Sequence, residues 1–383
     1  MTTETMSASP TEVGDRWEQL AAFALRGLAE TYGDSTEPLP YTAEWDGARL
    51  QCHGRSVRYA LISLLGLSRS YDSLEGAEDL AVRLWSKIDS LPTTEPLTPG
   101  DLGLGLWAQS LDRRYGRSFT AERALHALET RPSACDSVEL AWLLLGSDHA
   151  LLAGMDSEHV ESLGREAKRR LLELYNANTK LFYRHARSGA ARAVSRRVAC
   201  FANQIYPVMA LAVHARRTGC RKSREVAEAV ADHVCDKQGR LGQWWWLYDA
   251  RDGQVVDGYP VYSVHQDGMA PMALLEVTQA GGRSYADEIA LGMDWVFGEN
   301  ELDQRMVLEK CGLIQREIHL RGIGRVRRMI RGTLWCCGWQ SNGRTGSSRR
   351  SYVVNPECRP YHLGWVLYAA STMLAEESRG EDR

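Results

Sequence analysis

The feature that most constrains this chain is a repeated alternation of two kinds of helical segment. One kind is amphipathic, with charged residues along one side, and each copy precedes a segment that is apolar on nearly all sides. The amphipathic segments are 15–32, 74–91, 120–130, 157–175, 223–237 and 283–297. The apolar segments are 53–67, 100–111, 136–152, 201–215, 266–278 and 361–374.

Six such pairs bury their apolar helices most economically when those helices form an inner ring and the amphipathic helices surround it. We therefore predict an all-α protein, a six-hairpin α/α toroid (barrel), as a single domain over residues 15–376. A helical solenoid is the alternative, but solenoid repeats are more regular in length, whereas the connections here include a long basic insertion over 298–360. Disordered tails are expected at 1–14 and 377–383.

Composition narrows the possible partners. The 46 basic and 49 acidic residues give a net charge of -3, which provides no general field for binding nucleic acid. Nine irregularly spaced cysteines do not make a disulfide framework. No secretory signal opens the chain, and no apolar run reaches the roughly 20 residues that span a bilayer. We expect a cytoplasmic protein with a small-molecule, anionic partner, and a homo-oligomer is possible.

The amino ends of the inner helices converge on one mouth of such a ring, and the sequence is polar there. Asn203, His265 and His362 each stand at the start of an apolar segment. Helix amino termini present free N–H groups and a positive dipole end, so their convergence favours an anionic ligand. We expect the chemistry of the protein at this mouth.

The stretch 238–271 is the densest candidate site. Three consecutive tryptophans cannot all face one direction, and the Asp252–Gly253 pair that follows predicts a short hairpin leading to the fifth inner helix. The residues expected to line a substrate cavity are Trp244, Trp245, Trp246, Tyr248 and Tyr259, together with Asn203.

Asp267 is the predicted catalytic acid. A cage of aromatic rings excludes water and raises the pKa of a carboxyl group, and His265 would orient it. The same rings could stabilise a carbocation or an oxocarbenium-like sugar. Asp267 could instead be a plain helix cap. Tyr262 and His362 are the alternative proton carriers.

Residues 316–350 contain nine arginines against one acid, Glu317. Arginine matches the geometry of phosphate and carboxylate groups, so Arg316, Arg321, Arg325 and Arg328 are predicted to hold an anionic group of the substrate. A solvated basic face, or a contact with an acidic part of the same protein, is the alternative. No glycine-rich phosphate loop accompanies the arginines, which disfavours nucleotide hydrolysis.

Metal ligands are sparse in the sequence. Cys358 and His362 are four residues apart, with Cys336 and Cys337 upstream, but no CxxC pair or HExxH motif is present. We predict no metal and no cofactor, with Mg²⁺ or Zn²⁺ as the less favoured alternative.

One motif carries a family resemblance. Gln238, Gly242 and Trp244 fit the QxxxGxW pattern of terpenoid cyclases and prenyltransferase-type toroids, with Val234 at the aliphatic position that precedes it. The end of the chain, from 340–343 to Tyr361–His362, resembles a protein prenyltransferase β subunit, in which a histidine at a helix start binds zinc. The acidic DxDD and DDxxD motifs of the cyclases are absent. The alternating helices and Trp-rich mouth also resemble six-hairpin glycosidases, polysaccharide lyases and uronyl epimerases.

Three functions follow from these observations. The first is a terpenoid-cyclase-like enzyme of biosynthesis, a lyase or isomerase, acting on a prenyl or prenyl-diphosphate-derived substrate by acid-initiated carbocation chemistry. The second is a carbohydrate-active enzyme, namely a lyase, epimerase or glycoside hydrolase, acting on an acidic saccharide. The third is a non-catalytic toroid that presents its basic loop to an acidic partner. The sequence favours the first narrowly.

Overall fold

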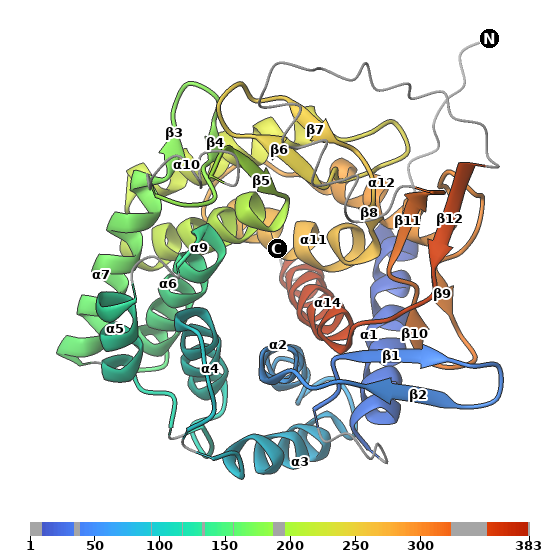
Figure 1. The fold of residues 1–383 in the computed structure, drawn as a ribbon, viewed down its shortest axis with the longest axis horizontal. Coiled ribbons are helices and arrows are strands. Elements are labelled where there is room, and N and C mark those ends of the chain that lie inside the picture. The colour runs from blue at the N-terminus through green and yellow to red at the C-terminus, as the bar shows by residue number, and fades with distance from the viewer. Residues whose placement is uncertain are drawn as a thin grey trace.

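The computed structural model describes residues 10–33, 39–92, 94–116, 118–131, 135–155, 157–186, 196–322 and 351–381. Its helices form the predicted α/α toroid. The inner ring consists of α2 (Val57–Ser68), α4 (Pro99–Leu111), α6 (Ser137–Leu152), α9 (Ala202–Thr218), α11 (Ala270–Gln279) and α14 (Pro360–Glu381). A short π-helix, η3 (His265–Met269), leads directly into α11. Each inner helix packs on the next, and α14 packs back on α2, which closes the ring (Figure 1).

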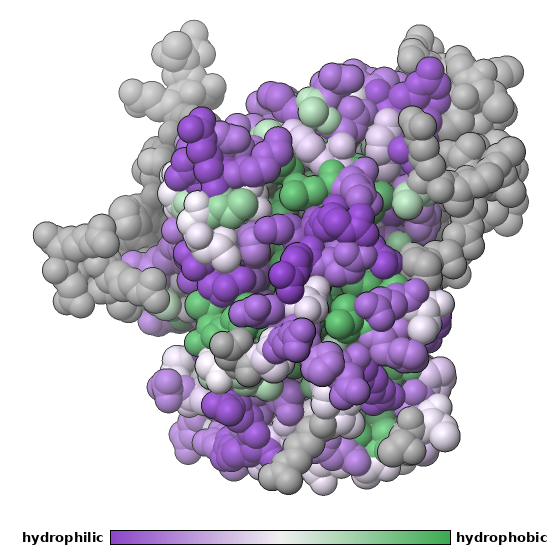
Figure 2. All heavy atoms as spheres, turned by 90° about the vertical axis from the view of Figure 1, so that its left-hand side faces the viewer, coloured by the Kyte–Doolittle hydropathy of each residue, from purple (hydrophilic) through white to green (hydrophobic). Residues whose placement is uncertain are grey.

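The outer ring consists of α1 (Pro10–Tyr32), α3 (Ala77–Asp89), α5 (Ala121–Thr130), α7 (Glu158–Glu173), α10 (Arg221–Asp236) and α12 (Ala286–Phe297). Its helices bury one stripe each. In α7 the buried residues include Val160, Leu163, Ala167 and Leu171, spaced three or four apart as one helix face requires. On the side that carries α5 and α7, most of the described surface is hydrophilic (Figure 2).

The caps of the inner helices explain where these helices begin. The Ser56 hydroxyl accepts the backbone N–H of Tyr59, and Thr98 and Asp101 form a reciprocal capping box. The first inner helix therefore starts at Val57, and the predicted start at 53 is wrong. Residues 50–53 belong instead to β2 (Leu50–His53), which pairs with β1 (Thr42–Trp45).

The two ends of the chain also differ from the predicted boundaries. Helix α1 begins at Pro10, five residues before the predicted start of the domain, and α14 continues to Glu381, past the boundary at 376.

Short strands occupy several helix connections, mainly in the second half of the chain (Figure 1). The predicted hairpin around Gly253 is confirmed: β6 (Leu247–Asp249) pairs antiparallel with β7 (Val255–Asp257), and β5 (Val198–Cys200) joins them. A second sheet orders β12 (Tyr352–Asn355), β11 (Glu317–Leu320) and β8 (Val261–Tyr262). Two smaller hairpins pair β3 (Tyr175–Asn176) with β4 (Leu181–Phe182) and β9 (Val307–Leu308) with β10 (Leu313–Ile314).

Glycines let the inner helices approach closely. A Cβ atom on Gly66 of α2 would lie 2.2 Å from the carbonyl oxygen of Gly364 in α14. A Cβ atom on Gly146 of α6 would lie 2.4 Å from the carbonyl oxygen of Gly103 in α4. Side chains larger than hydrogen cannot fit at these crossings, so these glycines set the diameter of the ring on two of its sides. Among the described helices, none is both long enough and apolar enough to cross a membrane.

Candidate functional site

A buried histidine–aspartate pair lies at the amino ends of the last two inner helices. Asp267 belongs to η3 and is fully buried, and His362 lies in the first turn of α14. Nε2 of His362 is 2.7 Å from Oδ1 of Asp267. A carboxylate only accepts hydrogen bonds, so Nε2 of His362 is the donor to Asp267, and Nδ1 is the ring nitrogen that does not take part in this bond. Oδ2 of Asp267 has no partner among the described residues.

His265 lies beside this pair. Its ring is 4.5 Å from that of Phe201 and 5.1 Å from that of Tyr262, measured between centroids. Burial lowers the pKa of His265 to about 3, and the charge of His362 acts in the same direction. The imidazole of His265 is therefore neutral near pH 7. Among the described contacts, Asp267 is hydrogen-bonded to His362 and not to His265. His362, rather than the predicted His265, is therefore the histidine that contacts this carboxylate.

Arg316 reaches the same group of residues. Its guanidinium lies 5.5 Å from the ring centroid of Tyr262 and is paired with Glu357 at 2.8 Å and Glu317 at 3.4 Å. Glu317 is opposite Tyr262 in the sheet of β8 and β11, and this register positions the arginine. Of the other predicted arginines, Arg321 is exposed at the end of β11. Arg325 and Arg328 lie outside the described residues.

The three tryptophans separate into different surroundings, as consecutive residues must. Trp244 is fully buried against Phe201, so it belongs to the core. Trp245 contacts Tyr259, and its indole N–H donates to the carbonyl of Lys237 at 2.6 Å. Trp246 contacts Tyr262, with ring centroids 6.0 Å apart, and is the tryptophan that joins the candidate site.

The remaining predicted lining residues are buried in the core or hydrogen-bonded within the protein. Tyr248 is fully buried, and the Tyr259 hydroxyl donates to Glu301 at 2.6 Å. The Asn203 side chain donates to Ser137 at 3.0 Å and accepts the backbone N–H of Cys200 at 3.0 Å. These contacts tie the start of α9 to the start of α6 and to strand β5. Asn203 thus connects two inner helices and a strand at the mouth.

A second charged group at the mouth was not predicted. Arg58, in the first turn of α2, bonds Asp101 of α4 at 2.7 Å and Glu139 of α6 at 2.8 Å, and lies 4.9 Å from the ring centroid of Trp142. Burial raises the pKa of Glu139, although Arg58 opposes the shift. These three residues share a sequence feature that could have revealed them: each is a charged side chain in the first turn of a largely apolar inner helix.

Aromatic rings lie between the two charged groups at the mouth and also below them, further into the ring. Tyr361, next to His362, lies 4.5 Å from Tyr59 between ring centroids. One turn further into the ring, Tyr206 contacts both Trp142 at 5.2 Å and Trp365 at 5.8 Å. The mouth therefore has a floor of large side chains contributed by α6, α9 and α14.

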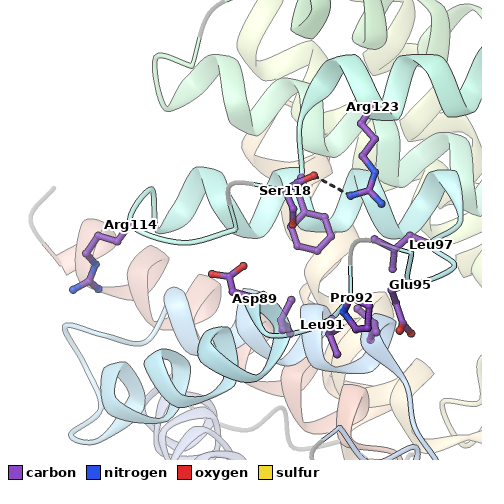
Figure 3. Close-up of a pocket in the computed structure, with 11 residues that line it drawn as sticks. Asp89, Leu91, Pro92, Glu95, Leu97, Arg114, Ser118 and Arg123 are labelled. Atoms are coloured by element: carbon purple, nitrogen blue, oxygen red, sulfur yellow. Dashed lines mark hydrogen bonds between the residues drawn. The ribbon is translucent and has the colours of Figure 1, made fainter.

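A separate hollow of about 390 Å³ lies between the end of α3, the start of α5 and the connection that precedes α4 (Figure 3). Asp89, Glu95 and Arg123 are among its polar lining residues, and Arg123 donates to the carbonyl of Ser118 at 3.1 Å. It shares no residue with the predicted site. Its charged groups have partners of their own, since Glu95 also accepts a bond from Arg55 at 2.8 Å.

Potential metal ligands do not gather in the described part of the chain, where no three His, Cys, Asp or Glu side chains are grouped to hold an ion. Cys358 is fully buried beside the start of α14. Cys336 and Cys337 lie outside the described residues.

The similarities to known proteins are structural. No protein-family model matches the chain, and no curated protein matches it in sequence. A sugar epimerase from a ruminal bacterium superposes with a TM-score of 0.64 at 10% identity, over 94% of this chain and 98% of the epimerase. An unsaturated glucuronyl hydrolase specific for heparin gives 0.62 at 13% identity, over 95% and 98%. The unsaturated glucuronyl hydrolase of Bacillus sp. GL1 gives 0.60 at 16% identity, over 96% and 97%.

These similarities cover nearly the whole of each chain and establish the α/α toroid as the fold. They also correct the first functional prediction. The neighbours named above are a sugar epimerase and two glucuronyl hydrolases, so the prediction of a terpenoid-cyclase-like enzyme of biosynthesis is wrong. The QxxxGxW match of Gln238, Gly242 and Trp244 has a structural explanation. Gln238 donates to the carbonyls of Gly242 and Glu288, and Trp244 is a core residue.

Proposed function

We propose that this protein is a carbohydrate-active enzyme that acts on an acidic saccharide, and that its chemical step is a proton transfer by His362. The observation that carries the proposal is the 2.7 Å hydrogen bond between Nε2 of His362 and Oδ1 of Asp267. Asp267 holds the imidazole in one tautomer and stabilises the imidazolium that forms when Nδ1 takes a proton. This is how a carboxylate supports a histidine base in other enzymes.

The neighbouring residues suit a proton transfer at a sugar carbon next to a carboxylate. Removing that proton places negative charge on the carboxylate group, and Arg316 supplies a positive charge beside Tyr262. His265 is a second, neutral imidazole in the same cluster. Two proton carriers are what an epimerisation needs, because the proton leaves one face of the carbon and returns to the other. The prediction that no cofactor takes part stays a prediction.

This proposal moves the acid assignment away from Asp267. Asp267 is fully buried and its Oδ1 is bonded to His362, so a proton would pass between Asp267 and a substrate only through His362, which is 3% exposed. We therefore assign the moving proton to His362 and a positioning role to Asp267. The names of the structural neighbours, one sugar epimerase and two glucuronyl hydrolases, support a saccharide substrate and, for the hydrolases, an acidic one.

Hydrolysis is the second candidate, and the carboxylates around Arg58 favour it. Glycoside hydrolysis requires one carboxyl group that can donate a proton and a second that stays ionised. Burial raises the pKa of Glu139, as a general acid requires, and Asp101 shares the same arginine. In this mechanism Glu139 would protonate the leaving group.

One experiment separates these reactions. The enzyme is incubated in D₂O with uronate-containing oligosaccharides, both saturated and unsaturated, and followed by proton NMR and near-ultraviolet absorbance. An epimerase incorporates deuterium into the sugar without a change in absorbance. A lyase creates the absorbance of the conjugated double bond, and hydrolysis of an unsaturated uronide removes it.

The variants assign the residues. His362→Gln should abolish the observed reaction if His362 transfers the proton, while Glu139→Gln should abolish it if hydrolysis depends on that carboxyl group. A folded protein that leaves every acidic saccharide unchanged would contradict the proposal. It would favour the non-catalytic reading, in which the basic stretch binds an acidic partner.

A further inference from the structure

The carboxyl ends of the inner helices hold a second polar cluster, far from the mouth. It consists of Arg69 after α2, Trp107 of α4, His149 of α6, Arg216 of α9, Glu276 of α11 and Tyr368 of α14. Along α6, His149 comes ten residues after Glu139, which is about 15 Å at 1.5 Å per residue. Trp365 separates this cluster from the mouth: its ring centroid is 6.0 Å from that of Trp107 in the cluster and 5.8 Å from that of Tyr206 below the mouth.

Three buried nitrogen atoms in this cluster have no hydrogen-bond partner among the described residues. His149 stacks on Trp107 with ring centroids 4.8 Å apart and an interplanar angle of 14°. Its side chain is 7% exposed, and Nε2 has no partner among the described residues. The same is true of Nε1 of Trp107 and Nε of Arg69. The indole and guanidinium groups can only donate, so whatever satisfies them must accept hydrogen bonds.

Two arginines of the cluster, Arg69 and Arg216, face one buried carboxylate, Glu276, and Glu376 lies nearby. Arg216 is paired with the buried Glu276 at 2.9 Å. Arg69 lies 4.8 Å from the ring centroid of Tyr368; its charge acts on Glu276, but it forms no ion pair with an acid in the described part of the chain. Glu376 is close enough for its charge to act on Glu276. Burial lowers the pKa of His149 to about 3, and the charges of Arg69 and Arg216 contribute, so the imidazole is neutral.

Arginines at the carboxyl ends of helices often serve only to offset the negative end of the dipole. That role does not account for Arg69. Its guanidinium is turned onto the face of Tyr368, and its buried Nε donates to no carbonyl in the described chain. The dipole contributes little beyond the last helical turn, whereas an unsatisfied buried donor costs more than an ordinary hydrogen bond provides.

We propose that this cluster is a binding site for a small oxyanion, a carboxylate or inorganic phosphate, held by Arg69, His149 and Trp107. Arg216 is 38% exposed, so the ligand would enter from the carboxyl-end face of the ring. The bound anion would join α2, α4 and α6 at the end opposite the mouth. The proposal does not depend on the function assigned to His362.

The test measures saturable stabilisation of the full-length protein. Its melting temperature is recorded against rising acetate or inorganic phosphate, at an ionic strength kept constant with sodium chloride, and binding is confirmed by calorimetry. The wild-type protein should show a saturating rise with at least one of the two oxyanions, and the stronger of them identifies the source of the ligand. Arg69→Gln should weaken the binding about tenfold or more, since a charge-assisted hydrogen bond is lost.

Two further variants make the result decisive. His149→Phe keeps the stacking on Trp107 while removing Nε2, so it should also weaken binding, and it provides the test should Arg69→Gln fail to fold. Arg221→Gln removes an exposed arginine that pairs only with Glu225 within its own helix, and should bind as the wild type does. Equal stabilisation in all variants, or no saturable rise with either oxyanion, would overturn the proposal. The unpartnered nitrogens would then be hydrogen-bonded to water.

Discussion

The described residues include two buried histidine–aspartate pairs, one at each end of the inner ring. At the mouth, His362 meets Asp267 at 2.7 Å, and no arginine or lysine among the described residues contacts that carboxylate. At the other end, His214 of α9 meets Asp148 of α6 at 3.0 Å, but Arg217 also bonds Asp148 at 2.7 Å. Lys168 of α7 then lies 3.1 Å from Nε2 of His214.

The two pairs differ in how many ring nitrogens of the histidine are hydrogen-bonded within the protein. A lysine ammonium only donates, so Nε2 of His214 accepts from Lys168 and its Nδ1–H donates to Asp148. Both nitrogens are committed, and the network joins α6, α7 and α9. His362 has one nitrogen bonded to Asp267. The His214–Asp148 pair therefore connects three helices, whereas the His362–Asp267 pair provides a candidate base.

The largest expected effect is on catalysis at the mouth. His362→Gln should reduce turnover of the acidic saccharide by about 100- to 10,000-fold, the usual contribution of a positioned acid or base, with little change in melting temperature. Asp267→Asn keeps the shape of the side chain and should also lose most activity. His214→Gln is the matched control and should retain turnover per folded molecule. Wild-type activity in His362→Gln would contradict the assignment of the proton transfer to His362.

At the opposite end the effect should fall on stability. Asp148→Asn removes the charge that holds His214 and Arg217, and should lower the free energy of unfolding by about 3 kcal/mol. This is the low end of the range for a broken buried pair, because Arg217 is 25% exposed. Urea unfolding measures the loss. A variant as stable as the wild type would mean that the network carries no net stabilisation.

Acid should destabilise the protein through histidines that are buried in the neutral form. The pKa of His149 is lowered to about 3 in the folded state, against 6.5 for an unperturbed histidine. Below pH 6.5 the unfolded chain therefore binds a proton that the folded chain does not, and stability falls as the pH falls towards 3. Each such histidine contributes about 1.4 kcal/mol per pH unit in this window.

His149→Phe should remove one such contribution, so its unfolding free energy should depend less steeply on pH between about 6 and 4. Urea unfolding at several pH values measures the slope. His126→Gln, on the outer helix α5, is the control and should leave the slope unchanged. An unaltered slope in His149→Phe would mean that the imidazole at this position is already protonated in the folded protein.

The smallest effect concerns Lys168. Lys168→Met removes the donor to Nε2 of His214 and should cost about 0.5–1.5 kcal/mol, the net value of one hydrogen bond. Nitrogen NMR of His214 should then show a change in the tautomer population, since Nε2 no longer has a fixed donor. An unchanged tautomer would show that Asp148 alone orients the ring.

The sequence predicted the fold more completely than the site. All twelve predicted helical segments exist, with ends shifted by a few residues, because hydrophobic periodicity records which face of each helix is buried. The site depends on pairs from distant parts of the chain. His362 and Asp267 were both candidates, yet their contact joins residues 95 positions apart, and the sequence placed His265 in that role.

Arg58 and Glu139 illustrate the same limit. Their ion pair spans 81 positions, and each taken alone is an ordinary charged residue near a helix start. The predicted role of Asn203 towards a ligand stays a prediction, and its side chain also bonds Ser137, which joins α9 to α6.

The alternation of apolar and amphipathic segments by itself determined the ring, because each apolar helix must be surrounded by others and each amphipathic one must face water on one side. Which polar side chains meet was decided by the tertiary structure. Ring closure brings α14 against α2 and η3, and the glycine contacts set how near their backbones come. Only at that separation does His362 reach Asp267, so the chemistry of the mouth depends on the closed ring.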